Sequence, residues 1–130
     1  MPLRTYWYDD EKTIYITEVD GVWTMDDFYQ YFEETVALIK TIPHDVVLIS
    51  DMSKSGKAPK QLLSAGRFMS KQRIPNVRLT ITVGVSQFGQ MLVKVMQKAY
   101  PSIRRGMLAQ DMDDAVRMAR EALETVKQVE

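Results

Sequence analysis

The segment from Ser53 to Lys60 holds the residues whose types and spacing are best suited to bind another molecule. It contains three lysines, Lys54, Lys57 and Lys60. A helix is expected to begin at Pro59, since proline is favoured in the first turn of a helix. Free N–H groups at a helix N-terminus attract anions, and lysine side chains strengthen that attraction. The pattern indicates an anion site; the alternative is a solvated loop that is merely basic, because loops are usually polar.

Two serines in the same segment are candidates for phosphorylation. A phosphate on Ser53 or Ser55 would gain from the positive field of the neighbouring lysines. The segment is not a P-loop, because Gly56 and Lys57 are followed by Ala58 rather than by serine or threonine. An upstream glycine at the required distance is also absent.

A pocket beside Gly84 and Phe88 is the second candidate site. Gly84 interrupts an alternating apolar pattern, and a glycine within a strand lets a ligand or another backbone approach closely. Open α/β sheets place ligands at the carboxyl ends of their strands. The nine methionines fit core packing, although methionine also suits adaptable binding surfaces. A small ligand or a lipid is therefore the alternative to a protein partner.

No residue set in the sequence makes up a catalytic or metal site. His44 is the only histidine, and a general base needs a nucleophile and an orienting group beside it. The acids Asp9, Asp10 and Glu11 are expected to form a solvated hairpin turn, and a metal there would need further ligands. The absence of cysteine excludes thiol chemistry and is compatible with a reducing compartment. We expect no enzyme activity, no catalytic residue, no metal, no cofactor, and a cytoplasmic location.

Charge is distributed unevenly, although the formal net charge is +0. Residues 1–51 sum to −8, residues 52–110 to +11 without one Asp or Glu, and residues 111–130 to −3. Such a basic stretch suits an acidic protein, an anionic lipid surface or nucleic acid. The basic stretch could instead pair with the acidic residues near position 30, in the same chain or in a second copy. This pairing is favoured over nucleic-acid binding, because no aromatic residues alternate with the charges as they do in proteins that bind single strands.

Length and hydrophobic periodicity predict one α/β domain over residues 1–130. The chain is 45% hydrophobic and fits a single core. Its apolar runs fall short of the ~18 residues of a membrane span. Strands are expected at 4–9, 13–19, 46–49, 79–85 and 106–109, and helices at 25–42, from 59, at 88–99 and from 112. An N-terminal hairpin followed by alternating helices and strands, in the order ββαβαβαβα, implies right-handed crossovers and a mostly parallel sheet.

The first helix has the clearest start signal. Thr24 is a suitable N-cap, and Asp27 three residues later is placed to complete a capping box. Trp23 before the cap and Phe28 within the helix have the spacing of a hydrophobic staple. Asp111 is expected to cap the last helix in the same way.

The order of elements over residues 10–123 resembles the STAS-like, SpoIIAA-like domains. Locally the resemblance rests on residues 21–28, 47–53 and 113–115. This group is related in fold to anti-sigma-factor antagonists and to cytoplasmic domains of sulfate transporters. In the antagonists a phosphorylatable serine lies in an Asp-Ser-Ser-Gly-like context. The nearest match here is residues 51–56, with Ser55 as the counterpart, although Asp51 stands four residues before it rather than next to it.

The resemblance implies a non-catalytic regulatory module that acts by binding a protein or a second copy of itself. The interaction surface it implies consists of Asp51, Ser53, Lys54, Ser55, Gly56, Lys57 and Lys60.

Overall fold

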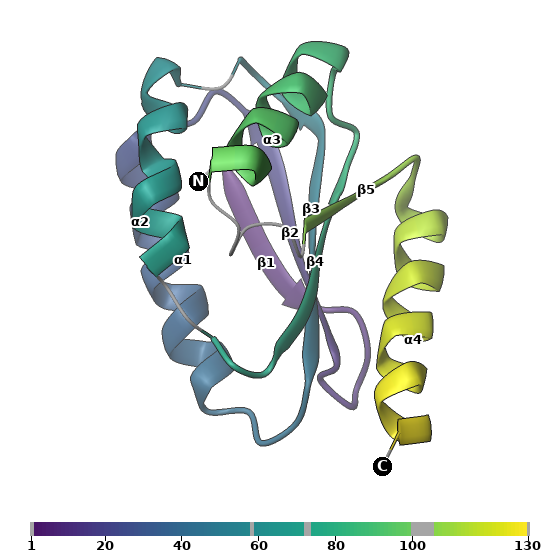
Figure 1. The fold of residues 1–130 in the computed structure, drawn as a ribbon. Helices are drawn as coiled ribbons and strands as arrows, with labels where there is room; N and C mark the ends of the chain where they lie inside the picture. The colour runs from purple at the N-terminus through teal and green to yellow at the C-terminus, as the bar shows by residue number, and fades with distance from the viewer. Residues whose placement is uncertain (1, 58, 72–73, 100–105, 130) are drawn as a thin grey trace.

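The computed structural model describes residues 2–57, 59–71, 74–99 and 106–129, without the side chains of Leu63, Ser64, Met69, Ser70, Phe88, Met96 and residues 125–129. A five-stranded sheet with the order β1-β2-β3-β4-β5 forms its centre (Figure 1). The elements are β1 (Leu3–Trp7), β2 (Ile14–Gly21), α1 (Met25–Lys40), β3 (Val46–Ser55), the 3₁₀ helix η1 (Lys60–Ser64), α2 (Ala65–Lys71), β4 (Val77–Val83), α3 (Gln87–Ala99), β5 (Gly106–Ala109) and α4 (Met112–Val129). β1 pairs antiparallel with β2, and the remaining pairs are parallel. The predicted α/β class, N-terminal hairpin and mostly parallel sheet are confirmed.

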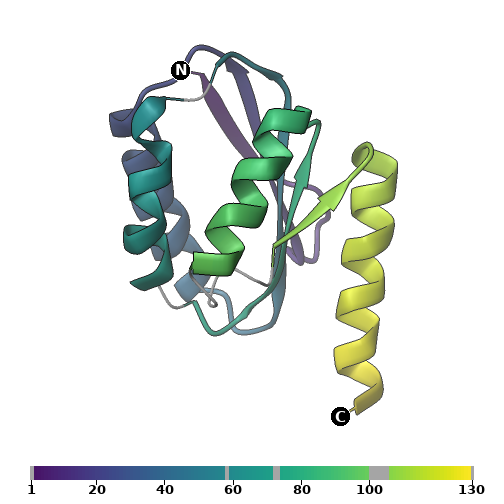
Figure 2. The same ribbon diagram turned by 45° about the horizontal axis from the view of Figure 1, so that its top comes forward.

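The strand order explains which face each helix covers. The strands from β2 to β5 lie side by side in chain order, so every crossover moves across the sheet in the same direction. Right-handed crossovers that all move one way place their helices on one face. Accordingly α1, α2 and α3 lie together, while α4, which follows the last strand and makes no crossover, lies on the opposite face (Figure 1 and Figure 2).

The sheet is buried from both sides. On the α4 side, Ile49 and Ile81 from neighbouring strands pack with Ala115 and Ala119 of α4. On the α1 side, Tyr15, Ile39 and Val46 form a second core. The predicted strand from Val46 to Ile49 is apolar on both faces, which is typical of a central strand, and β3 is the middle strand of the sheet.

A small buried polar cluster sets the position of α1 on the sheet. The Thr17 hydroxyl of β2 donates to the Tyr31 hydroxyl of α1 at 3.0 Å. Burial raises the pKa of Tyr31 and keeps the phenol neutral, although the hydrogen bond from Thr17 acts in the opposite direction. Because a buried hydroxyl without a partner is costly, the pair favours one register of α1 over others.

Both predicted helix caps are present. The Thr24 hydroxyl accepts from the backbone N–H of Asp27, and the Asp27 carboxylate accepts from the N–H of Thr24. The rings of Trp23 and Phe28 lie 6.3 Å apart, as the staple requires. These contacts fix the angle at which the chain enters α1.

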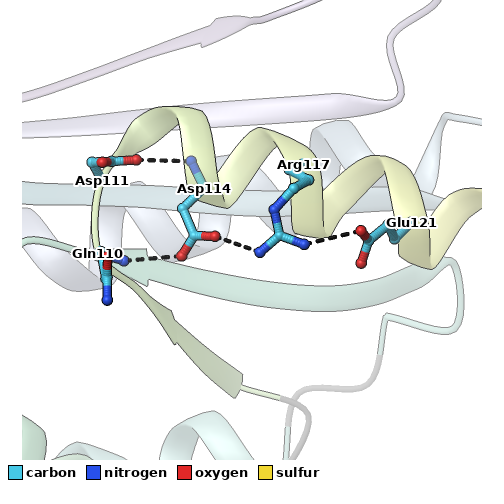
Figure 3. A network of polar contacts seen from close by, with 5 residues as sticks. All are labelled: Gln110, Asp111, Asp114, Arg117 and Glu121. Carbon is cyan, nitrogen blue, oxygen red and sulfur yellow. Dashed lines mark hydrogen bonds and ion pairs between the residues drawn. The ribbon is translucent and has the colours of Figure 1, made fainter.

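The start of α4 is held by a chain of polar contacts (Figure 3). Asp111 accepts from the backbone N–H of Asp114 at 2.8 Å, and Asp114 accepts from that of Gln110 at 3.2 Å. The Arg117 guanidinium forms one ion pair with the Asp114 carboxylate at 2.5 Å and another with the Glu121 carboxylate at 2.9 Å. The hydrogen bond from Arg117 holds the pKa of Asp114 below its ordinary value. Exposed ion pairs contribute little stability, so the cap is the part that defines where α4 begins.

The hairpin turn between β1 and β2 is organised by Asp9. Its carboxylate accepts from the N–H of Thr13 at 2.9 Å, from the N–H of Ile14 at 3.3 Å, and from the Thr13 hydroxyl. Partial burial alone would raise the pKa of Asp9, but the bonds from Thr13 and Ile14 outweigh it and lower the pKa.

Replacing this carboxylate should therefore make stability depend less on pH. We expect Asp9→Asn to lower the free energy of unfolding by about 1 kcal/mol at pH 7. A group whose pKa is lowered in the folded state stabilises above its ordinary pKa, and the contribution is lost as the pH falls below about 4. Urea unfolding at pH 7 and at pH 3 measures the difference. Asp10→Asn, at an exposed neighbouring position, is the control, and a D9N effect that does not shrink at pH 3 would contradict the assignment.

No helix of the described residues combines the length and the apolar character needed to cross a membrane.

Candidate binding surface at the carboxyl ends of the strands

The segment from Asp51 to Ser55 is the second half of β3. Register with β4 ends at Asp51, but pairing with β2 continues through Lys54 and Ser55. The strand predicted at 46–49 therefore continues to Ser55. The prediction ended it too early because the residues from Asp51 onward are polar and lack the apolar pattern of a buried strand. Pairing with β2, which itself extends to Gly21 rather than ending at residue 19, defines the strand instead.

A β-bulge then changes the direction of the side chains. The register of β2 and β3 shifts so that two residues of β3, Met52 and Ser53, lie opposite a single residue of β2. A bulge re-aims the side chains that follow it. The Ser55 hydroxyl consequently meets the Trp23 indole, whose Nε1 donates to it at 2.9 Å.

The two candidate serines have different environments. Ser55 is half-buried, accepts from Trp23, and donates to the carbonyl oxygen of Gly56 at 2.8 Å. Ser53 is exposed, and its hydroxyl donates to the Asp51 carboxylate at 2.6 Å. Ser53 is therefore the more accessible of the two, while the Ser55 hydroxyl joins β3 to the start of α1.

Gly84 brings the two candidate segments of the sequence together. It has φ +75°, and a Cβ added to it would lie 2.7 Å from both Cα and N of Ser53. The sequence suggested that a backbone or a ligand could approach Gly84 closely, and the backbone of Ser53 does so. The side chain of Phe88, proposed with Gly84 as a pocket, lies outside the part of the chain that the structure describes.

An open groove of about 600 Å³ lies between the start of α1 and the segment before α2. Its lining residues are Trp23, Thr24, Met25, Asp26, Tyr29, Pro59 and Gln61. The Tyr29 ring meets Phe68 of α2 edge-on, with ring centres 4.9 Å apart, so Tyr29 is fixed between the two helices. The sequence predicted Trp23 and Thr24 only as the start signal of the first helix and Pro59 only as the start of the next, so the groove itself was not predicted.

Lys54, Lys57 and Lys60 are exposed and lie in the part of the chain that leads from the end of β3 to η1. In the sequence, Lys60 stands between Pro59 and Gln61, which both line the groove. The expectation that an α-helix begins at Pro59 was wrong: η1 is a 3₁₀ helix of five residues, and α2 begins only at Ala65. An anion would consequently rely on the lysine side chains. We call these lysines, the exposed Ser53 and the groove the carboxyl-edge surface.

The only histidine of the sequence lies away from this surface. Within the described ranges, no group of His, Asp and Glu residues is arranged to hold a metal ion. His44 is exposed and lies before β3, at the amino ends of the parallel strands and therefore at the edge opposite the groove. Its Nδ1 lies 3.1 Å from the carbonyl oxygen of Asp45.

No protein-family model matches the chain, and no curated protein is similar to it. The STAS-like resemblance stays a prediction, and the geometry of the carboxyl-edge surface is the evidence on function.

Proposed function

We propose that this protein is a non-catalytic regulatory module of STAS-like type that binds a segment of a partner protein at the carboxyl-edge surface. The observation that carries the proposal is an open groove lined by Trp23 and Tyr29, next in the chain to a segment with three exposed lysines. Both are built on backbone held by the Trp23–Ser55 hydrogen bond and by the close contact of Gly84 with Ser53.

The form of the groove favours a polypeptide over a small molecule. Small-molecule sites bury most of the ligand surface, whereas this groove is open to solvent. Tyr29, Met25 and Pro59 offer apolar contact to one side chain of a partner, and aromatic residues and methionine are enriched at protein interfaces. Lys57 and Lys60 would attract acidic residues that flank this side chain.

The fixed backbone reduces the cost of binding. The N–H of Gly56 donates to the carbonyl oxygen of Gly21 at 2.7 Å, which ties the end of β3 to the end of β2. The Thr24–Asp27 capping box fixes the opposite wall. A preorganised surface loses less conformational entropy on binding than a flexible one.

Regulation by phosphorylation fits Ser53 better than Ser55. The Ser55 hydroxyl is bonded to Trp23, and a phosphate there would disrupt that contact. A phosphate on the exposed Ser53 adds a charge of about −2 beside the lysines. We expect it to weaken the binding of an acidic segment.

A photo-reactive residue placed at Lys60 tests this function in the cells that make the protein. We expect light to produce one discrete adduct with a partner protein. The matched control is Glu124, an exposed residue of α4 on the other face of the sheet, where no such adduct should form. No adduct at Lys60, or the same adducts from both positions, would overturn the proposal.

A small ligand is the second candidate, because a volume of about 600 Å³ lies in the range of small-molecule sites. The topology does not supply the usual crevice, however. That crevice forms where the order of parallel strands reverses, and β2 to β5 follow one direction across the sheet.

A further inference from the structure

Helix α3 leaves apolar side chains in solvent. Met91 and Val95 are each 53% exposed, and residues four apart lie on one face of a helix. Among the described side chains of α3 none is fully buried, and Leu92 and Val93 are half-buried. A surface helix normally turns its apolar stripe to the core, so this stripe has room for a further partner.

The charges beside this stripe are positive. Lys94 and Lys98 are exposed, and no ion pair between described side chains includes either of them. Residues 52–110 contain no Asp or Glu that could serve as a near neighbour in sequence. The partner of this face should therefore present carboxylates next to small or apolar groups.

Helix α1 presents such a surface. Glu33, Glu34 and Ala37 are exposed on it, and the two glutamates lie one turn from the small alanine. Within one chain α1 cannot meet α3, because successive crossovers place α2 between them on the same face of the sheet (Figure 2). A second copy of the chain has no such restriction.

We infer that two copies of this chain associate through their helical faces, with α3 of each copy on α1 of the other. A two-fold axis parallel to the helices places α1 of the second copy opposite α3 of the first, and α3 of the second copy opposite α1 of the first. In both contacts the lysines of α3 therefore meet the glutamates of α1. At 1.5 Å per residue α1 is about 24 Å long, and three helices 8–10 Å apart span roughly 30 Å. Because α3 has 13 residues and α2 only 7, the helical faces cover roughly 550 Å² per copy, which is the size of a small, weak interface.

Charge reversal tests this pairing directly. We expect the wild-type chain to be dimeric in light scattering at about 100 μM and low salt, where even a micromolar interface is largely formed. Lys94→Glu with Lys98→Glu, and separately Glu33→Lys with Glu34→Lys, should each weaken dimerisation at least tenfold. An equimolar mixture of the two variants should restore the dimer, because both contacts of the mixed pair are again complementary.

The variant Lys54→Glu with Lys57→Glu, on the carboxyl-edge surface, is the control and should remain dimeric. Circular dichroism of each variant verifies folding. A monomeric wild-type chain, or folded variants whose mixture stays monomeric, would overturn the inference. Neither result depends on whether the carboxyl-edge surface binds a protein.

Discussion

Replacing Trp23 with alanine is expected to lower the free energy of unfolding by about 4 kcal/mol, the usual cost of removing a large buried aromatic side chain. Trp23 is only 6% exposed. Its ring packs near Phe28, and its N–H donates to Ser55. The substitution therefore removes the staple of α1 and the contact between α1 and β3 at once, and it should abolish binding at the groove.

Trp23→Phe separates the ring from the hydrogen bond. This substitution keeps most of the apolar volume but removes the hydrogen-bond donor. Loss of the donor should lower the free energy of unfolding by about 1 kcal/mol, in addition to the cost of the smaller ring. A double-mutant cycle with Ser55→Ala, followed by urea unfolding, should give a coupling of about 1 kcal/mol between the two sites. Additive effects of the two substitutions would show that the hydrogen bond contributes nothing.

Gly84→Ala is expected to cost about 3 kcal/mol. A non-glycine residue at positive φ costs roughly 1–2 kcal/mol, and Gly84 has φ +75°. The new Cβ would also lie 2.7 Å from backbone atoms of Ser53, which cannot rotate away. Overpacking of this kind typically costs a further 1–3 kcal/mol.

Gly21→Ala is the matched control for this substitution. Gly21 has a nearly identical φ of +79°, but a Cβ there meets no atom within 4 Å. It should therefore show only the cost of the backbone conformation, about 1–2 kcal/mol. Equal destabilisation by the two substitutions in urea unfolding would mean that β3 does not approach Gly84 closely.

The sequence predicted the arrangement of elements because that arrangement depends on local signals. The continuous apolar run at Val46–Ile49 gave the central strand, and Thr24 with Asp27 gave the start of α1. The chain order of strands and helices, with the rule for right-handed crossovers, was enough to predict a mostly parallel sheet.

The candidate surface was only partly predictable because it depends on contacts between distant segments. The polar end of β3 is a strand only through its pairing with β2, and periodicity carries no signal for that. The bulge that turns Ser55 toward Trp23 also arises between strands. The groove joins residues near Trp23 to residues near Pro59, and their types fit a helix start equally well.

The most direct test of the carboxyl-edge surface is native mass spectrometry of the protein purified from its own cells at low salt. The wild-type chain should carry a discrete additional protein mass beyond that of the chain or its dimer. The variant with Lys54, Lys57 and Lys60 all replaced by glutamate should lose that mass, while Lys94→Glu with Lys98→Glu should keep it. A wild-type chain with no added protein, with only a small molecule bound, or with a partner that the triple variant retains would contradict the proposed function.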